Sequence, residues 1–196
     1  MRIQKKFHYL LFASLLMIFS SCDLSEVFDD EDDMDEPETE IVTAKINGEA
    51  FSAVESDDAL IQLDQVEGDL DLNGDVFELS FTATDFGQSY LTTLSLSLQG
   101  LNYSDLKAGS QFVGFTEENL SSGNPTGAAG VVAKASLDGE TEFGGITLLV
   151  GTIEVELTKL DKENELMSGE FSFVAYDDDN DTNIVVTEGV FTNVEF

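Results

Sequence analysis

Cysteine, histidine and basic residues are scarce in this chain of 196 residues. It contains one Cys, one His and no Trp, and its 8 Lys and Arg stand against 40 Asp and Glu, for a formal net charge of −32. One Cys forms no internal disulfide, and one Cys with one His cannot build a typical structural zinc site. The charge argues against nucleic-acid binding and against adhesion to an anionic membrane through basic residues, since both need clustered Lys and Arg.

A long apolar run is also missing, and this decides how the N-terminus is interpreted. Three basic residues within the first six precede the apolar stretch 7–19, and Ser20 and Ser21 follow it. A stretch of 13 residues is too short to span a bilayer, which takes about 20. A basic start, an apolar centre and small residues at the end form the layout of a secretory signal peptide, which we expect at residues 1–21.

The only Cys of the chain follows this segment directly. Cys22 after two Ser residues resembles the lipobox of bacterial lipoproteins, with Phe19 where that motif usually has Leu, Val or Ile. The resemblance implies that Cys22 becomes the lipid-carrying first residue of the mature chain and anchors it in a membrane. The alternative is an ordinary secretory signal with an incidental Cys nearby. Cleavage before Cys22 removes the only His and the only Arg, and leaves five Lys.

Residues 22–40 are expected to form the lipidated Cys and a disordered acidic tether. Eleven of the 18 residues in 23–40 are acidic and none is basic. Such a block cannot bury enough apolar surface to offset its ordering entropy, and self-repulsion extends it. Acidic residues soon after the lipidated Cys resemble surface-export signals of Bacteroidota lipoproteins. An Asp directly after the Cys favours the inner membrane in other Gram-negative bacteria, and a plain solvated linker is a third interpretation.

Apolar and polar residues alternate through the remaining chain, residues 41–196, as in strands with one buried face. Leu91 breaks the parity with Leu94, which predicts a bulge near Thr92. We expect one helical turn at most, at 104–108, and an irregular loop or broken edge strand at 117–130. The alternation is clearest in four segments: 77–84, 94–99, 153–158 and 171–176.

Turn signals separate these segments. Asn-Gly and Asp-Gly pairs suit both central positions of a type I′ turn, and short links force neighbouring strands to run antiparallel. We therefore predict an all-β fold, a single antiparallel β-sandwich formed as a hairpin meander of roughly nine or ten strands, with a closed or partly open β-barrel as the alternative. The predicted turns lie at Asn47-Gly48, Asn73-Gly74 and Asp138-Gly139.

Three further motifs carry a family resemblance. They are Ile46-Asn47-Gly48-Glu49-Ala50-Phe51, Gly169-Glu170-Phe171-Ser172-Phe173 and Gly189-Val190-Phe191-Thr192-Asn193. With the lipobox and the acidic tether, they resemble a family of uncharacterised Bacteroidota lipoproteins. The resemblance covers both ends of the chain and leaves the middle unmatched. It implies a β-domain at the outer membrane or cell surface, and it brings no catalytic residues.

Carboxylates are the main chemical resource that remains, because a mature chain without His or Cys has no Ser-His-Asp triad, Cys nucleophile, imidazole ligand or thiolate ligand. Asp177, Asp179 and Asp181 occupy positions 1, 3 and 5 of an EF-hand-like loop. Thr182 replaces the Gly of position 6, and the flanking segments are expected strands rather than helices, which argues against an EF-hand. A non-EF calcium loop is one hypothesis, and a solvated hairpin loop is the alternative. We expect no other cofactor.

Paired carboxylates raise a second hypothesis. A glycosidase needs two of them about 5–10 Å apart across a cleft. Glu154 with Glu156 and Glu140 with Glu142 share strand faces, which the wet face of a sheet explains equally well. We expect an envelope lipoprotein whose domain is a non-enzymatic binding or structural module for a glycan or protein ligand. The alternatives are a lipocalin-like carrier of a small apolar ligand and a carboxylate-based glycoside hydrolase.

Overall fold

The computed structural model describes residues 39–54, 65–121, 123, 125–138 and 140–196, which belong to one unit, Glu38–Phe196. The expected signal peptide and Cys22 lie outside the described residues, as does all of the expected tether except its last two residues. The elements are β1 (Ile41–Ile46), β2 (Glu49–Val54), β3 (Val66–Asn73), β4 (Val76–Phe86), β5 (Tyr90–Leu101), η1 (Tyr103–Asp105), β6 (Gln111–Val113), α2 (Glu117–Ser121), β7 (Gly127–Ser136), β8 (Thr141–Ile146), β9 (Thr152–Asp161), β10 (Leu166–Asp177) and β11 (Thr182–Glu195).

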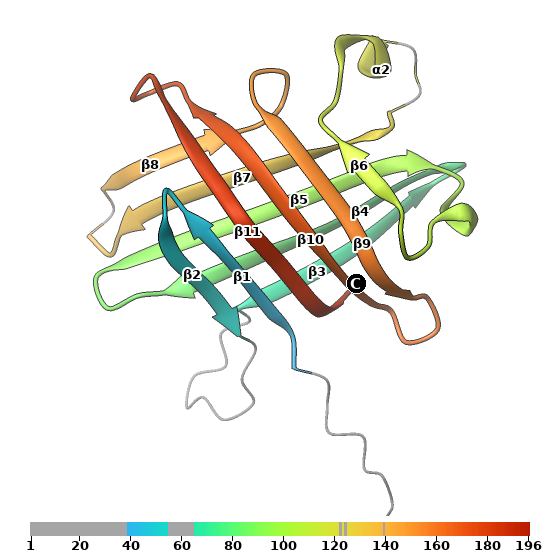
Figure 1. Cartoon of the computed structure of the whole chain (residues 1–196), viewed down its shortest axis with the longest axis horizontal. Coiled ribbons are helices and arrows are strands. Elements are labelled where there is room, and N and C mark those ends of the chain that lie inside the picture. Colours follow the sequence, from blue (N-terminus) through green and yellow to red (C-terminus); the bar gives the residue numbers. More distant parts are fainter. Residues whose placement is uncertain (1–38, 55–64, 122, 124, 139) are drawn as a thin grey trace, which may run out of the picture. The chain divides into compact units, whose positions relative to one another are not determined.

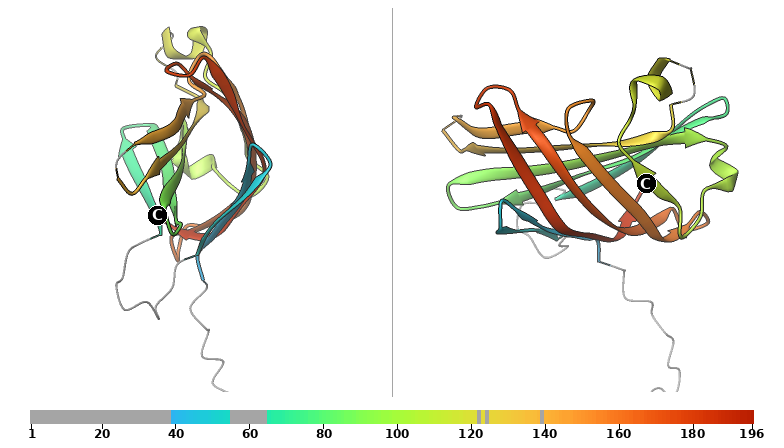
Figure 2. Two further views of the ribbon diagram at one scale, coloured as in Figure 1. Left: turned by 90° about the vertical axis from the view of Figure 1, so that its left-hand side faces the viewer. Right: turned by 45° about the horizontal axis from the view of Figure 1, so that its top comes forward.

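These strands form one sheet in the order β2-β1-β11-β10-β8-β7-β5-β4-β3. Two strands lie off this path: β9 also pairs with β10, and β6 pairs with β9. The ladders between the strands are antiparallel. The sheet curls over itself into a half-barrel, with β1, β2, β9, β10 and β11 in one wall and β3, β4, β5, β7 and β8 in the other (Figures 1 and 2). The antiparallel all-β prediction is confirmed, and the geometry lies between a sandwich and a barrel because the two walls are one continuous sheet.

The core lies between the two walls. Along β4 and β5 buried residues alternate with half-buried ones, as the sequence pattern predicts. Aromatic rings fill the interior: the ring centroids of Phe81 and Phe191 are 5.0 Å apart, and the Phe171 ring packs beside both. Rings at centroid separations of this size attract each other in addition to burying apolar area. The Phe173 ring stacks on that of Phe171, and elsewhere in the core the Phe77 ring packs edge-on against those of Phe112 and Tyr103.

Two bulges bend β11, the strand between β1 and β10. Each inserts one extra residue into β11, and the inserted regions contain Glu188 and Asn193, both at φ 52°. Bulges of this kind increase the local twist, which helps the sheet to curl. The glycines of two sequence motifs explain the close packing beside them. A Cβ on Gly189 would lie 2.4 Å from the Phe171 ring, and one on Gly169 would lie 2.4 Å from the Phe191 ring.

The predicted turns are confirmed only in part. Asn47 and Gly48, at φ 51° and 85°, are the central residues of the β1–β2 hairpin. The prediction for the β3–β4 hairpin is wrong by one residue, because Asn73 pairs with Val76 and the central residues are Gly74 and Asp75. Only Gly74 has a positive φ there, as the first central residue of a type II′ turn does. In the β7–β8 connection, Gly139 lies outside the described residues.

Two further expectations are wrong. The ladder between β4 and β5 is unbroken, so there is no bulge at Thr92; instead Thr92 is buried and Leu91 lies on the outer face. The segment 117–130 is neither a loop nor an edge strand throughout, because it contains α2 and the start of β7, which lies between β5 and β8. Gly127 and Gly130 interrupt the alternating pattern by which the sequence would indicate this strand. They stand where the rings of Phe115 and Phe173 approach the backbone and leave no room for a larger side chain.

Candidate functional site

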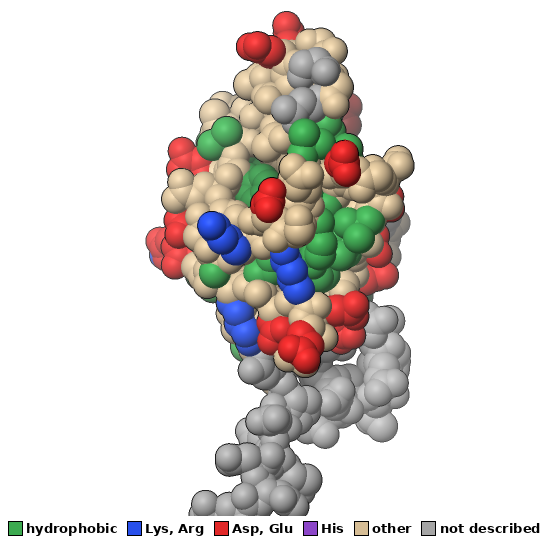
Figure 3. Space-filling model, turned by 90° about the vertical axis from the view of Figure 1, so that its right-hand side faces the viewer, with side chains coloured by type: hydrophobic (Ala, Val, Ile, Leu, Met, Phe, Trp, Pro, Cys, Tyr) green, Lys and Arg blue, Asp and Glu red, His purple; other side chains and the backbone are tan. Residues whose placement is uncertain are grey.

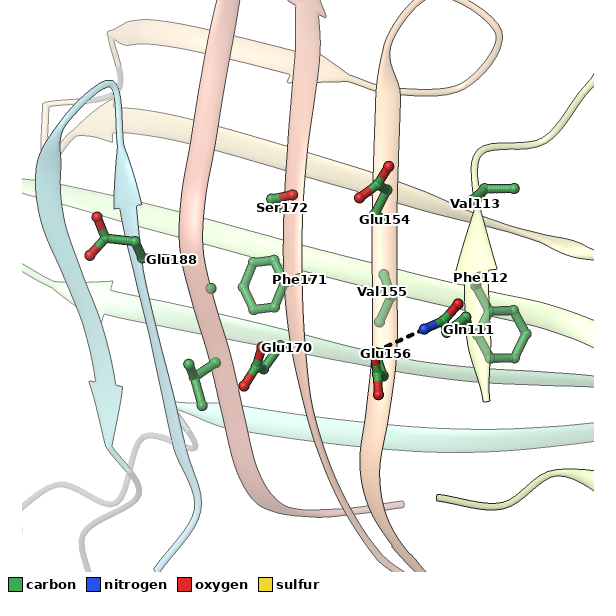
Figure 4. Close-up of a pocket in the computed structure, with 12 residues that line it drawn as sticks. Gln111, Phe112, Val113, Glu154, Val155, Glu156, Glu170, Phe171, Ser172 and Glu188 are labelled. Atoms are coloured by element: carbon green, nitrogen blue, oxygen red, sulfur yellow. Dashed lines mark hydrogen bonds between the residues drawn. The ribbon is translucent and has the colours of Figure 1, made fainter. Parts of the chain in front are cut away.

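The outer face of β6, β9, β10 and β11 carries a shallow hollow with a volume of about 630 Å³ (Figure 4). Its polar side chains occupy the outward positions of strands whose alternate residues fill the core. Four carboxylates from three strands therefore share one exposed surface. The polar residues that line the hollow are Gln111, Glu154, Glu156, Glu170, Ser172 and Glu188.

Two of these carboxylates are directly opposed. Glu156 of β9 and Glu170 of β10 are register partners, an arrangement that destabilises a sheet because like charges repel. The amide of Gln111 donates a hydrogen bond to Glu156 at 3.0 Å, which relieves part of this cost. Among the described residues, the carboxylates of Glu154 and Glu170 have no hydrogen-bond or ion-pair partner. The hollow can accept hydrogen bonds from hydroxyl, ammonium or guanidinium groups, and it repels anions.

Glu188 lies at the edge of this hollow in a bulge of β11. Its carboxylate pairs with Lys45 of β1, with an Nζ–Oε1 distance of 2.8 Å. Both side chains are exposed, and exposed pairs contribute little to stability, about 0–1 kcal/mol at the median. The pair lies on the β1 side of the hollow and occupies the Glu188 carboxylate, so the carboxylates of β9 and β10 are the remaining acceptors.

The candidate calcium residues lie elsewhere, in the loop between β10 and β11. Asp177 is buried, and its carboxylate accepts four N–H groups: the backbone amides of Asp179 and Asn180 at 3.1 Å, the Asn180 side chain at 2.8 Å and the Gly144 amide at 3.1 Å. These bonds, led by the one from the Asn180 side chain, hold the pKa of Asp177 below its ordinary value of 3.8. Asp177 therefore orders the loop and ties it to β8.

The other two candidate ligands have different surroundings. The Asp181 carboxylate accepts the hydroxyl of Tyr176 at 2.7 Å, and this hydrogen bond raises the pKa of Tyr176 above 10.0. Asp179 contributes its backbone amide to the loop. The described part of the chain contains no group of three or more His, Cys, Asp and Glu side chains placed to hold a metal ion. N–H donors account for the order of this loop, and calcium binding stays a prediction.

The second pair of glutamates leads to a feature that sequence reasoning missed. Glu142 pairs with Lys134 at 2.9 Å, and the Lys134 ammonium also lies 3.8 Å from Glu49 and 4.3 Å from the centroid of the Tyr90 ring. The hydrogen bond to Glu142 raises the pKa of Lys134 above 10.5 despite its partial burial. A hollow of about 200 Å³ adjoins this cluster. In the sequence, this cluster was indicated only by Lys134 itself, the single charged residue in a strand of mostly small and apolar residues.

Comparison with family models, with curated proteins and with solved structures finds no match. None of the helices in the described residues is long and apolar enough to cross a membrane. The features of the chain that bear on function are therefore its sequence motifs and the surfaces of the half-barrel.

Proposed function

We propose that this chain is a lipid-anchored lipoprotein of a bacterial cell envelope, held in the outer membrane by Cys22 and exposed at the surface. The observation that carries the proposal is the position of the only Cys, directly after two small residues at the end of the apolar segment. Acyl chains on this Cys would anchor the protein stably, since each buried CH₂ contributes about 0.8 kcal/mol. The acidic segment before β1 would then hold the domain away from the lipid surface.

Lipidation is tested by replacing the anchor residue in the full-length protein. Cells expressing the wild type or Cys22→Ala are given an alkyne fatty acid, and the membrane and soluble fractions are analysed for label and for protein. The wild type is expected to carry label and to fractionate with membranes, whereas Cys22→Ala loses both properties. A labelled or membrane-bound Cys22→Ala protein would show that the anchor lies elsewhere. Protease treatment of intact cells then distinguishes surface exposure from an inward-facing anchor.

For the domain, we propose a non-enzymatic binding or structural role. The support is that apolar side chains, many of them aromatic, pack between the two walls, while the polar groups lie on an exposed sheet face. A hydrolase would instead use the opposed Glu156 and Glu170 as its carboxylate pair. A screen of glycans and basic proteins, run with calcium and with a chelator, separates these roles. Binding lost in Glu154→Gln and Glu170→Gln supports the binding role, whereas glycoside cleavage that is lost in Glu156→Gln supports the hydrolase.

A further inference from the structure

The main strand order of the half-barrel ends in β2 and β3, and the outer edges of these two strands have different surroundings. On β2, the backbone amide of Val54 donates to the side-chain oxygen of Gln65 at 3.3 Å. On β3, the first residues lie against the end of β11, where a Cβ on Gly68 would lie only 2.1 Å from the backbone oxygen of Glu195. Beyond Gly68, β3 pairs only with β4 among the described strands.

The hairpin between β3 and β4 fixes which backbone groups point away from β4. Asn73 and Val76 flank a two-residue turn and so form a hydrogen-bonded pair, and such pairs recur at every second residue of an antiparallel ladder. At the far end of the ladder, the Thr84 amide donates to the Gln65 oxygen at 2.7 Å. Gln65 precedes Asn73 by an even number of residues, so this bond agrees with the same alternation of hydrogen-bonded pairs. These two observations determine which residues of β3 bond to β4 and which direct their backbone groups away from it.

In this phase, Asp69 and Asp71 bond to β4, whereas the backbone N–H and C=O groups of Leu70 and Leu72 point outward. These four groups have no backbone partner among the described residues. The side chains alternate too: Leu72 is 55% exposed beside Leu70 on the inner side, and the carboxylates of Glu67, Asp69 and Asp71 are exposed on the outer side. Figure 3 views the unit from the side on which the β3–β4 hairpin lies in Figure 1, and apolar side chains gather on this face.

We propose that the β3 edge at Leu70 and Leu72 binds an extended peptide of a protein partner by strand addition, and that basic residues alternate with apolar ones in this peptide. The outward N–H and C=O groups would pair with the peptide backbone and set its register. Directly opposite residues of paired strands point to the same face, so Lys or Arg of the peptide would lie beside Asp69 and Asp71. Its apolar residues would cover Leu72 and continue the inner wall of the half-barrel.

A second copy of the chain fits this edge poorly. Antiparallel pairing of two β3 edges about a twofold axis would place Asp69 and Asp71 of one copy against the same residues of the other. Opposed like charges destabilise a sheet and are one means by which proteins prevent edge-to-edge association. The carboxylates therefore select a cationic strand over self-association. This surface deepens the proposed binding role and does not depend on the anchor, which the Cys22 experiment tests separately.

The test uses the full chain and a synthetic peptide, Lys-Val-Lys-Val-Lys-Val-Lys, with Glu-Val-Glu-Val-Glu-Val-Glu as the matched control. Amide exchange measured by NMR is expected to slow at Leu70 and Leu72 in the presence of the Lys peptide alone. The amides of Asp69 and Asp71 already bond to β4 and should change little. Protection confined to β9 and β10 instead would mean that the peptide binds the acidic hollow, and that outcome overturns the proposal.

Two substitutions at one position separate the backbone from the side chain. Leu70→Pro removes an N–H that does not bond to β4, so the ladder to β4 is retained, whereas Leu70→Ala keeps the N–H and loses the side chain. Leu70→Pro is expected to weaken Lys-peptide binding at least tenfold, about the loss of one or two hydrogen bonds, and Leu70→Ala about threefold or less. Equal affinities of Leu70→Pro and the wild type would overturn strand addition.

A third variant keeps the proposal testable if Leu70→Pro fails to fold. Replacing both Asp69 and Asp71 by Asn leaves the backbone unchanged and removes the two outer charges. This variant is expected to bind the Lys peptide about fivefold more weakly at low salt and to lose most of the salt dependence of binding. Unchanged affinity and salt dependence would contradict the assigned surface. Concentration-dependent dimers of the wild type that become tighter in this variant and are lost in Leu70→Pro would identify a second copy as the occupant and overturn the peptide proposal.

Discussion

The hairpin loops at the two ends of β10 have the same hydrogen bonds in different surroundings. Asp161 accepts the backbone amides of Glu163 and Asn164 at 3.1 Å and the side chain of Asn164 at 2.8 Å. Asp177 repeats these three bonds with the equivalent residues of its own loop, at the same distances. Both loops also end in a residue with positive φ, Glu165 at 57° and Asp181 at 52°.

The difference lies in what surrounds the first Asp of each loop. Asp177 is 1% exposed and accepts a fourth donor, the amide of Gly144 in β8, whereas Asp161 is only half-buried. Near this loop β8 meets β10 through a single pair of residues, Tyr176 and Ile146. The Asp161 loop therefore only reverses the chain direction, whereas the Asp177 loop also joins the two walls through its hydrogen bond with β8.

The largest expected effect comes from removing the two carboxylates in turn. Asp177→Ala leaves several N–H groups without their acceptor beside the junction of the walls, so we expect Tm to fall by about 5–10 °C. Asp161→Ala exposes its donors to water and is expected to lower Tm by about 1–3 °C. Differential scanning calorimetry of the full chain measures both. Equal losses of Tm would show that the bond to β8 contributes nothing.

A pH titration sharpens the comparison. In both loops the Asn side chain, with the backbone amides, lowers the pKa of the Asp. A lowered pKa stabilises the fold fully above the unfolded pKa, and this stability is lost as the pH falls through the folded value, so Tm should drop below about pH 4. The drop should be smaller in Asp177→Asn and slightly smaller in Asp161→Asn. A wild-type acid profile in Asp177→Asn would assign the acid sensitivity to other carboxylates.

The smallest expected effect concerns the last residue of each loop. A non-glycine residue at positive φ is strained, so Glu165→Gly is expected to raise Tm by about 1–3 °C. Asp181→Gly relieves the same strain but removes the acceptor of the Tyr176 hydroxyl, and its Tm should stay near that of the wild type. Thermal unfolding of the two variants side by side checks this. A gain in Asp181→Gly as large as that in Glu165→Gly would mean that the Tyr176 hydrogen bond has no stabilising value.

Local patterns predicted much of this fold because each depends on a few neighbouring residues. Alternation located β4, β5, β9 and β10, and Asn47-Gly48 located one turn correctly. The break in parity at Leu91 was a real signal with the wrong interpretation. Thr92 takes the inward position in phase with Leu94, and it lines the hollow near Lys134. A polar inward residue in a strand can thus indicate a lined hollow as well as a bulge.

Other features were missed because they depend on distant parts of the chain. The opposed pair Glu156 and Glu170 follows from the register of β9 against β10, and the bulges of β11 follow from its two partners. By contrast, α2 had a local signal. Thr116 and Asn119 cap its start reciprocally, the Asn119 amide donating to the Thr116 hydroxyl and the Thr116 amide to the Asn119 side chain.

The position of β11 has a consequence for the order of folding. The last strand in the chain lies between β1 and β10, and its partner Ile41 is about 150 residues away from Thr192. The β10–β11 hairpin can form locally, but β1 and β2 have no place in the sheet until β11 is available. Such long-range pairing slows folding and leaves strand edges exposed while it lasts. The half-barrel must therefore assemble late in synthesis, once β11 has emerged from the ribosome.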